Sequence, residues 1–192
     1  MTWQQLSVAL KSEAPILLHN GQTSDPLNYY SKEIKKISSK RNKTDADHEE
    51  LARLEWFASL YLNKKEQLVI PSHMLEAMFV NGAKKTRQGK QAQAGFFVEN
   101  NPLLEFDGQG LTPEELWERD QNRYVMAVNV QRNKIMRTRF ITEDWELNLV
   151  CNYNNEHFNK SSVVEIFQTA GANVGIGDWR PKFGRFFVDN VA

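Results

Sequence analysis

The stretch that most constrains the fold runs from Ser161 to Val188, where a helix pattern gives way to a glycine-rich loop and a short strand. Ser162 and Glu165 have the spacing of a capping box, which predicts the start of a helix. Apolar residues follow at helical spacing, and Gly171 fits the left-handed residue that ends many helices. We therefore expect a helix, a loop and a final strand from Phe183 to Val188.

The loop between this helix and the final strand has a composition that suits binding of a polyanion. Gly175, Gly177 and Gly184 carry no side chain, so another backbone can come close to them. Cations in such a loop neutralise phosphates, and an aromatic ring stacks on bases. The loop contains four such side chains: Trp179, Arg180, Lys182 and Arg185. A tight connection, in which the aromatic rings only fill the core, is the alternative that this composition leaves open.

Two strand patterns precede the helix. Apolar and polar residues alternate strictly from Tyr124 to Val130, which predicts a strand with one buried face. A second strand is expected from Ile135 to Val150, and its apolar positions change parity, which predicts a bulge or bend between Ile141 and Asp144. Arg137 and Arg139 share one face of this strand. Because neighbouring arginines on a strand are costly unless solvated or paired, both are candidates to meet phosphate.

Three further helix starts are predicted from capping signals. Thr44 with Asp47, and Thr112 with Glu115, have the spacing of a capping box. Ser72 is expected to be the N-cap of a third helix with one apolar face. The predicted buried stripe of that helix consists of Leu75, Met78, Phe79, Gly82 and Ala83.

The order of these elements predicts the fold class. Apolar residues alternate from Leu6 to Leu10 and then form a run from Ile16 to Leu18, which predicts a first strand. The core order is then βαββαβ, which indicates an α+β fold of the ferredoxin-like type that RNA-recognition domains also use. We expect a single domain over residues 1–192, with insertions at about residues 19–70 and 87–122 and a glycine-rich loop before the last strand.

Charge is segregated along the chain although the chain is neutral overall. Lys plus Arg and Asp plus Glu each number 24, so no whole-molecule field is expected to attract nucleic acid. Basic residues nevertheless gather in residues 32–43, 84–90 and 131–139. These segments predict one basic face, or, alternatively, solvated surfaces paired with acidic helices. The polar residues 20–44 are expected to form a mobile loop, with a short helix from Asn28 to Ile37 as the alternative.

Several classes of protein lack their signatures in this sequence. The single cysteine, Cys151, leaves no internal disulfide and fits a reducing, cytoplasmic setting. No apolar run is long enough to span a membrane, and the N-terminal residues do not fit a signal peptide. The sequence has no P-loop motif, and its histidines lack metal-ligand spacing, so neither a cofactor nor a metal is expected.

Three segments have the pattern of a known family. They are the end of the first strand from Pro15 to His19, the stretch from Val69 to Ala77, and the glycine-rich loop. The second is similar to the family's I-P-x-S-x-L-K-G helix start, with Glu76-Ala77 in place of Lys-Gly. The chain thereby resembles the RAMP superfamily, in particular the backbone subunit of CRISPR effector complexes. The ending from Gly177 to Phe186 is also similar to that of uncharacterised phage and prophage proteins.

This resemblance implies a non-enzymatic protein that binds single-stranded RNA or DNA. Members of the family bind guide RNA in a repeating filament, so we expect a homo-oligomer that assembles along the strand, encoded by a phage and acting in the cytoplasm. A second hypothesis is an anti-defence protein that imitates or binds the backbone subunit of a CRISPR effector complex. A third is a ribonuclease, because some relatives use a histidine base, for which His19 is the candidate.

The residues expected to contact nucleic acid come from the basic segments and the glycine loop. Each cation among them is expected to neutralise about one phosphate. The predicted set is Lys36, Lys40, Arg41, Lys43, Lys84, Lys85, Arg87, Arg132, Lys134, Arg137, Arg139, Gly175, Gly177, Trp179, Arg180, Lys182 and Arg185.

Overall fold

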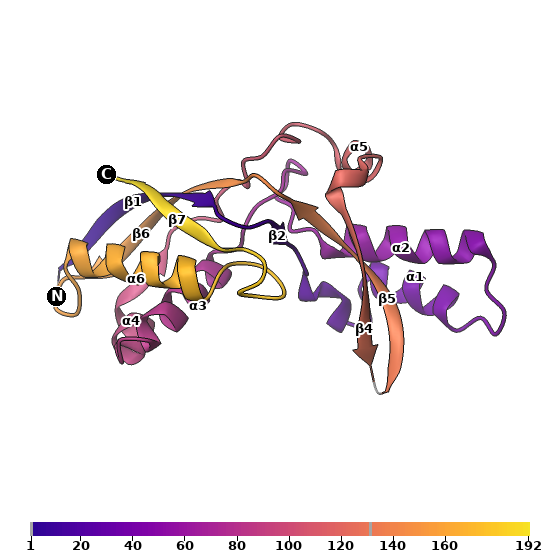
Figure 1. Cartoon of the computed structure of the whole chain (residues 1–192), viewed down its shortest axis with the longest axis horizontal. Coiled ribbons are helices and arrows are strands. Elements are labelled where there is room, and N and C mark those ends of the chain that lie inside the picture. The colour runs from indigo at the N-terminus through magenta and orange to yellow at the C-terminus, as the bar shows by residue number, and fades with distance from the viewer. Residues whose placement is uncertain (1, 131) are drawn as a thin grey trace. The chain divides into compact units, whose positions relative to one another are not determined.

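The structure is a computed structural model that describes residues 2–130 and 132–192 (Figure 1). Its helices and antiparallel sheets confirm the predicted mixed α+β class. The chain divides into two compact units, each of which is described by itself. Unit 1 comprises Met1–Ile16, Leu62–Gly110 and Thr142–Ala192, and unit 2 comprises Leu17–Tyr61 and Leu111–Ile141.

Unit 1 combines a four-stranded sheet with three helices. Its elements are β1 (Trp3–Ser12), α3 (Ser72–Lys84), α4 (Gly89–Gly95), β3 (Phe96–Val98), β6 (Glu146–Asn154), α6 (Lys160–Asn173) and β7 (Phe186–Val191). The strands lie in the order β3-β6-β1-β7, and each is antiparallel to its neighbours. In Figure 1, α4 and α6 lie below the sheet that contains β1, β6 and β7.

The core of unit 1 lies between the sheet and the helices. Leu6, which pairs with Cys151, and Val8, which pairs with Leu149, are buried on the same face of the sheet. Phe79 of α3 stacks on Phe96, with ring centroids 3.7 Å apart and planes 10° apart, which joins the helix to β3. The predicted stripe of α3 is confirmed, since its buried residues are Leu75, Met78, Phe79, Gly82 and Ala83.

Helix α6 lies close to its neighbours because glycine omits a side chain at two contacts. A Cβ on Gly82 of α3 would lie 2.7 Å from an alanine side chain of α6, and one on Gly171 would lie 2.1 Å from the carbonyl oxygen of Phe186. The sequence predicted that Gly171 ends the helix, but Gly171 lies inside it. The helix ends at Asn173, and Gly175 follows in the left-handed conformation with φ +75°.

Two helix starts differ from the predicted ones by a few residues. The N-cap of α6 is Asn159, whose side chain accepts the Ser162 N–H at 2.8 Å, so Ser162 completes the capping box instead of beginning it. Helix α3 has Pro71 as its N-cap and Ser72 as its first residue. The Ser72 N–H donates to the side-chain oxygen of Asn101 at 2.8 Å. Because Asn101 lies far from Ser72 in the sequence, the residues around Ser72 give no signal of this hydrogen bond.

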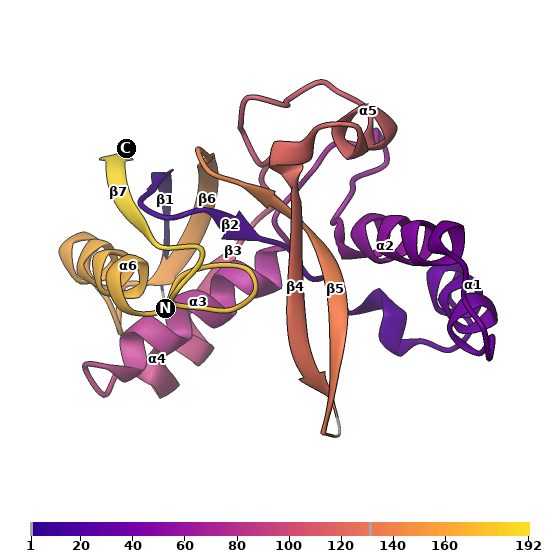
Figure 2. The same ribbon diagram turned by 45° about the vertical axis from the view of Figure 1, so that its right-hand side comes forward.

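Unit 2 joins a three-stranded sheet to two long helices (Figure 2). Its elements, including strand β2 at the unit boundary, are β2 (Ile16–Leu17), the 3₁₀ helix η1 (Gly21–Ser24), α1 (Tyr29–Ser38), α2 (Asp45–Ser59), α5 (Pro113–Trp117), the 3₁₀ helix η2 (Asp120–Asn122), β4 (Arg123–Val130) and β5 (Asn133–Thr142). The strand order is β2-β5-β4. The capping boxes of Thr44 with Asp47 and of Thr112 with Glu115 are confirmed, and α1 forms close to the short helix predicted for residues 28–37.

Trp56 of α2 is the centre of the core in unit 2. Its ring is fully buried, and its centroid lies 5.6 Å from that of Trp117 and 5.9 Å from that of Phe140. Its indole N–H donates to the Asn122 carbonyl at 2.7 Å. Because a buried indole needs an acceptor, this bond fixes α2 against the segment that leads into β4.

The strands of the second half form where they were predicted, but they pair differently. The strand from Tyr124 to Val130 is β4, which pairs with β5 and not with the sheet of unit 1. The second strand next to β6 is the three-residue β3, which lies in the predicted insertion. The predicted strand from Ile135 to Val150 is two strands in different sheets, and their interruption at residues 143–145 overlaps the bend predicted between Ile141 and Asp144. The final strand begins at Phe186, three residues later than predicted.

We predict that Gly171→Ala destabilises the protein. The new Cβ would lie 2.1 Å from the Phe186 carbonyl oxygen, so α6 and β7 would have to separate. Such overpacking costs about 1–3 kcal/mol or more of unfolding free energy, measurable by urea denaturation. The matched control is Gly21→Ala, where nothing lies within 4 Å of the added Cβ. Equal stability of the two variants would contradict the close contact between α6 and β7.

We also predict that Cys151 is unreactive in the folded protein. Its side chain has no exposed surface, and burial raises the pKa of the thiol to about 12 from an ordinary 9.0. Because the thiolate is the reactive form, a disulfide reagent at pH 8 should modify the protein only in denaturant. Because the thiol has a higher pKa in the folded state than in the unfolded state, its titration also affects stability. The free energy of unfolding is unaffected below about pH 9 and decreases as the pH rises from 9 toward 12. Rapid modification of the native protein would contradict the burial.

Candidate nucleic-acid interface

The glycine-rich loop is held in place by close contacts within the chain itself. The Ile176 N–H donates to the Gly184 carbonyl at 2.9 Å, and the Gly184 N–H donates to the Pro15 carbonyl at 2.7 Å. A Cβ on Gly184 would lie 1.7 Å from the Ile176 carbonyl oxygen, and one on Gly175 would lie 2.9 Å from the Phe183 carbonyl oxygen. Both glycines have positive φ, so their absent side chains serve the shape of the loop.

This loop and the end of α3 line a hollow on unit 1, which we call the glycine-loop groove. It is an open hollow of about 770 Å³, lined among others by Lys84, Lys85, Gly177, Asp178, Trp179 and Arg180. The basic segment after α3 and the glycine loop were predicted separately from the sequence. The structure places cations from both segments around one hollow.

Trp179 has an exposed ring on a strained backbone. Its exposed fraction is 41%, and its φ of +50° lies in the left-handed region, which costs free energy for residues other than glycine. Phe183, whose ring centroid lies 6.4 Å from that of Trp179, is only 6% exposed. The loop therefore buries its phenylalanine and presents its tryptophan to the groove.

Two cations of the loop interact with their own surroundings. The Lys182 ammonium lies 5.5 Å from the centre of the Phe183 ring. The Arg185 guanidinium lies 4.0 Å from a carboxylate oxygen of Glu13 and donates to the Pro181 carbonyl at 3.3 Å. Neither residue lines the glycine-loop groove.

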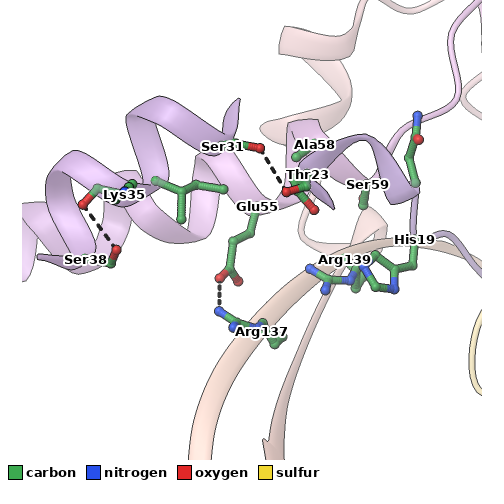
Figure 3. Close-up of a pocket in the computed structure, with 12 residues that line it drawn as sticks. His19, Thr23, Ser31, Lys35, Ser38, Glu55, Ala58, Ser59, Arg137 and Arg139 are labelled. Atoms are coloured by element: carbon green, nitrogen blue, oxygen red, sulfur yellow. Dashed lines mark hydrogen bonds and ion pairs between the residues drawn. The ribbon is translucent and has the colours of Figure 1, made fainter. Parts of the chain in front are cut away.

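A second basic site lies in unit 2, in a cavity of about 380 Å³ that we call the α1–α2–β5 pocket (Figure 3). Helix α1 contributes hydroxyls and one cation, α2 contributes its buried face, and β5 contributes two arginines. The residues that carry its chemistry are His19, Lys35, Glu55, Ser59, Arg137 and Arg139. The structure thus brings both arginines of the predicted strand face into one cavity.

Glu55 is the buried carboxylate of this pocket, with an exposed fraction of 9%. It accepts the backbone N–H of Thr138 at 3.1 Å and forms an ion pair with the Arg137 guanidinium, which Figure 3 draws as a dashed line. The Ser59 hydroxyl accepts the N–H of Phe140 at 3.1 Å. Two side chains of α2 therefore complete the hydrogen bonds of β5. Sequence reasoning missed Glu55, whose only signal is an acid next to the apolar face of a helix.

His19 lines this pocket, as does Arg139, and both are labelled in Figure 3. Its backbone carbonyl accepts the Tyr61 hydroxyl at 2.9 Å, which fixes the chain at this point. In the described part of the chain no group of three or more His, Cys, Asp or Glu side chains could hold a metal ion. The ribonuclease role of His19 stays a prediction.

The predicted cations around the end of α1 contact their own neighbours. Lys36 lies 2.6 Å from a carboxylate oxygen three residues earlier, and Lys40 lies 2.5 Å from the Asp47 carboxylate. The hydrogen bond from Lys40 lowers the pKa of Asp47 to about 2. The Lys43 ammonium donates to the Lys40 carbonyl at 2.9 Å, and Arg41 is exposed beside it. None of these side chains lines the α1–α2–β5 pocket.

Three further predicted cations lie outside both basic sites. Arg87 follows α3 in the left-handed conformation, with φ +63°, and lines another hollow with Lys90 and Lys84, of which only Lys84 also lines the glycine-loop groove. Arg132 lies exposed between β4 and β5, and Lys134 lies exposed near the start of β5. The predicted basic set is therefore distributed over several places, and only part of it is gathered into cavities.

Comparison of the chain with protein-family models and with curated proteins gives no match. The resemblance to the RAMP superfamily thus stays a prediction. Within residues 2–130 and 132–192, no helix has the length and apolar character needed to cross a membrane.

We predict that Glu55 and Arg137 are strongly coupled. Arg137→Met removes the cation and leaves a buried carboxylate, so unfolding free energy should fall by about 1–3 kcal/mol. The double variant with Glu55→Gln should lose less than the sum of the single variants. The control is Lys36→Met in the exposed pair with Glu33, which should change stability by less than about 1 kcal/mol. Additive losses in a denaturation cycle would refute the coupling.

Proposed function

We propose that this chain is a non-enzymatic protein that binds single-stranded nucleic acid, RNA or DNA, in the glycine-loop groove. The observation that carries the proposal is the exposed ring of Trp179 in a hollow shared with Lys84, Lys85 and Arg180. Sequence-tolerant binding of single strands combines such a ring, on which a base stacks, with cations that follow the phosphates. Asp178 is the acidic residue among those that line the groove.

The strain at Trp179 supports a binding role. A non-glycine residue in the left-handed region costs about 1 kcal/mol or more, and the backbone bonds around Gly184 hold the loop in spite of that cost. If Trp179 only filled the core, burial of its ring would offset the cost of the strained backbone, yet 41% of this residue is exposed. Residues held in sparsely populated backbone conformations cluster at functional sites.

We propose also that unit 1 is a ferredoxin-like core. With the short α4 set aside, its elements follow as strand, helix, strand, strand, helix and strand. The strand order β7-β1-β6-β3, antiparallel throughout, supports this arrangement. The second strand is β3 and not the segment from Tyr124 to Val130 that the sequence favoured.

The outer face of this sheet is a poor surface for a polyanion. Lys11 lies 3.4 Å from the carboxylates of both Glu146 and Asp189, so its charge is offset there. The Asn152 amide donates to Glu99 at 2.6 Å and lowers the pKa of that carboxyl below its ordinary 4.5, so the group is negatively charged at neutral pH. Because ionised carboxylates repel phosphates, we assign strand binding to the groove and not to the sheet face.

The test compares two exposed tryptophans in binding to a labelled single-stranded oligonucleotide at fixed salt. Trp179→Ala should lose about 1–3 kcal/mol of binding free energy, as expected for a lost stacking ring, with little change in melting temperature. Trp3→Ala is the matched control, because Trp3 is 44% exposed but packs edge-on against Phe97 outside the groove. Equal losses in the two variants, or no binding by the unaltered protein, would refute the proposed function.

The salt dependence of binding tests the cations separately. Each of Lys84→Gln and Lys85→Gln should reduce the slope of log affinity against log salt by about one. Lys64→Gln is the control, since this exposed lysine lies in a turn away from the groove. An unchanged slope in the first two variants would mean that the groove does not contact phosphates.

A further inference from the structure

The α1–α2–β5 pocket of unit 2 shares no residue with the glycine-loop groove. Its volume of about 380 Å³ lies in the range of small-molecule sites. The buried part of its lining includes Ala58 and Ser59, which are 3% and 1% exposed. These side chains are short, so they fill little of the cavity that they line.

The charges that line this pocket do not cancel. Arg137 and Arg139 project from the same face of β5, because residues two apart on a strand point the same way. Glu55 pairs with Arg137 and offsets one positive charge. Lys35 adds a third cation from α1, on the opposite side of the cavity from the arginines (Figure 3). Among the described residues, the lining therefore keeps a surplus of positive charge.

Glu55 also makes the site rigid. Its second carboxylate oxygen is held by the Thr138 N–H at 3.1 Å, so the ion pair fixes the Arg137 side chain relative to the backbone of β5. A guanidinium held in this way can meet two oxygens of a planar or tetrahedral anion without further ordering. Glu55 is thus a positioning residue for the arginine.

A phosphate monoester fits these properties better than a running strand does. A monoester carries a charge of about −1.5 to −2 at pH 7. A phosphodiester carries only one negative charge per phosphate, so a single phosphate of a running strand would offset less of the positive charge of this lining. The Ser38 hydroxyl donates to the Lys35 carbonyl in its own turn, at 3.3 Å, and can rotate toward a phosphate oxygen instead.

We propose that the α1–α2–β5 pocket binds a terminal phosphate monoester, carried by a free mononucleotide or by the end of a nucleic-acid strand. Arg139 and Lys35 contact the phosphate, and Arg137, held by Glu55, completes the positive lining. The proposal stands apart from strand binding in the glycine-loop groove, since it uses different residues in the other unit.

Calorimetric titration of the full chain at fixed salt tests the proposal. Adenosine monophosphate should bind, and adenosine should not, because only the phosphate meets the cations. Lys35→Gln and Arg139→Gln should each weaken the binding of the monophosphate about 10- to 100-fold, as expected for a lost hydrogen bond to a charged group. Because Lys35 is exposed on α1, Lys35→Gln is expected to fold, so it still tests the proposal if Arg139→Gln does not fold.

Two further variants show that the effect belongs to this pocket. Lys36→Gln removes the neighbouring charge on α1, which pairs with Glu33 and does not line the pocket, and should leave the affinity unchanged. Trp179→Ala should also leave it unchanged, although the same variant should weaken strand binding. Loss of monophosphate binding in Trp179→Ala would place the phosphate in the groove and overturn the proposal.

A pair of oligonucleotides distinguishes the two sources of phosphate. A strand with a terminal phosphate should bind more tightly than the same strand with a terminal hydroxyl if the pocket holds strand ends, and Lys35→Gln should abolish the difference. No difference between the strands, with the free monophosphate still bound, assigns the pocket to free nucleotides. Equal binding of adenosine and its monophosphate, or failure of the monophosphate and the phosphorylated strand alike to bind, would overturn the proposal.

Discussion

Unit 1 depends on one contact that leaves no room for a side chain, the approach of the Phe186 carbonyl to Gly171. This contact brings the start of β7 against α6, and β7 then pairs with β1 at the edge of the sheet. The chain between Asn173 and Phe186 must return over a short distance, which the left-handed glycines allow. Backbone hydrogen bonds hold this loop, including one from the Phe183 N–H to the Trp179 carbonyl, while the Trp179 ring remains exposed.

Unit 2 depends in a comparable way on a polar contact. A single carboxylate, Glu55, accepts a backbone N–H of β5 and an arginine of the same strand. Two N–H groups of the central strand β5, those of Thr138 and Phe140, are thus satisfied by side chains of α2 and not by a neighbouring strand. The cost of burying Glu55 is offset only while Arg137 remains beside it. Glu55 and Arg137 therefore both hold α2 against β5 and help to set the charge of this pocket.

The sequence predicted what is local and failed where pairing is decided by distant segments. The buried stripe of α3 and the capping boxes at Thr44 and Thr112 were correct because the signal lies within a few residues. The partner of β6 was wrong, because β3 has only three residues and its place depends on packing against Phe79. The two basic cavities were not predicted as such, since each gathers residues from separate segments.

The interleaving of the two units along the chain has a consequence for synthesis on the ribosome. Every residue of unit 2 lies between Leu17 and Ile141, whereas unit 1 needs β1 from the beginning and β7 from the end of this sequence. Unit 2 can therefore complete its contacts while α6 and β7 are still untranslated. Until β7 is made, β1 can pair only with β6. The edge of β1 that later pairs with β7 stays open to other nascent chains. Slow translation of the last segment would lengthen the exposure of that edge.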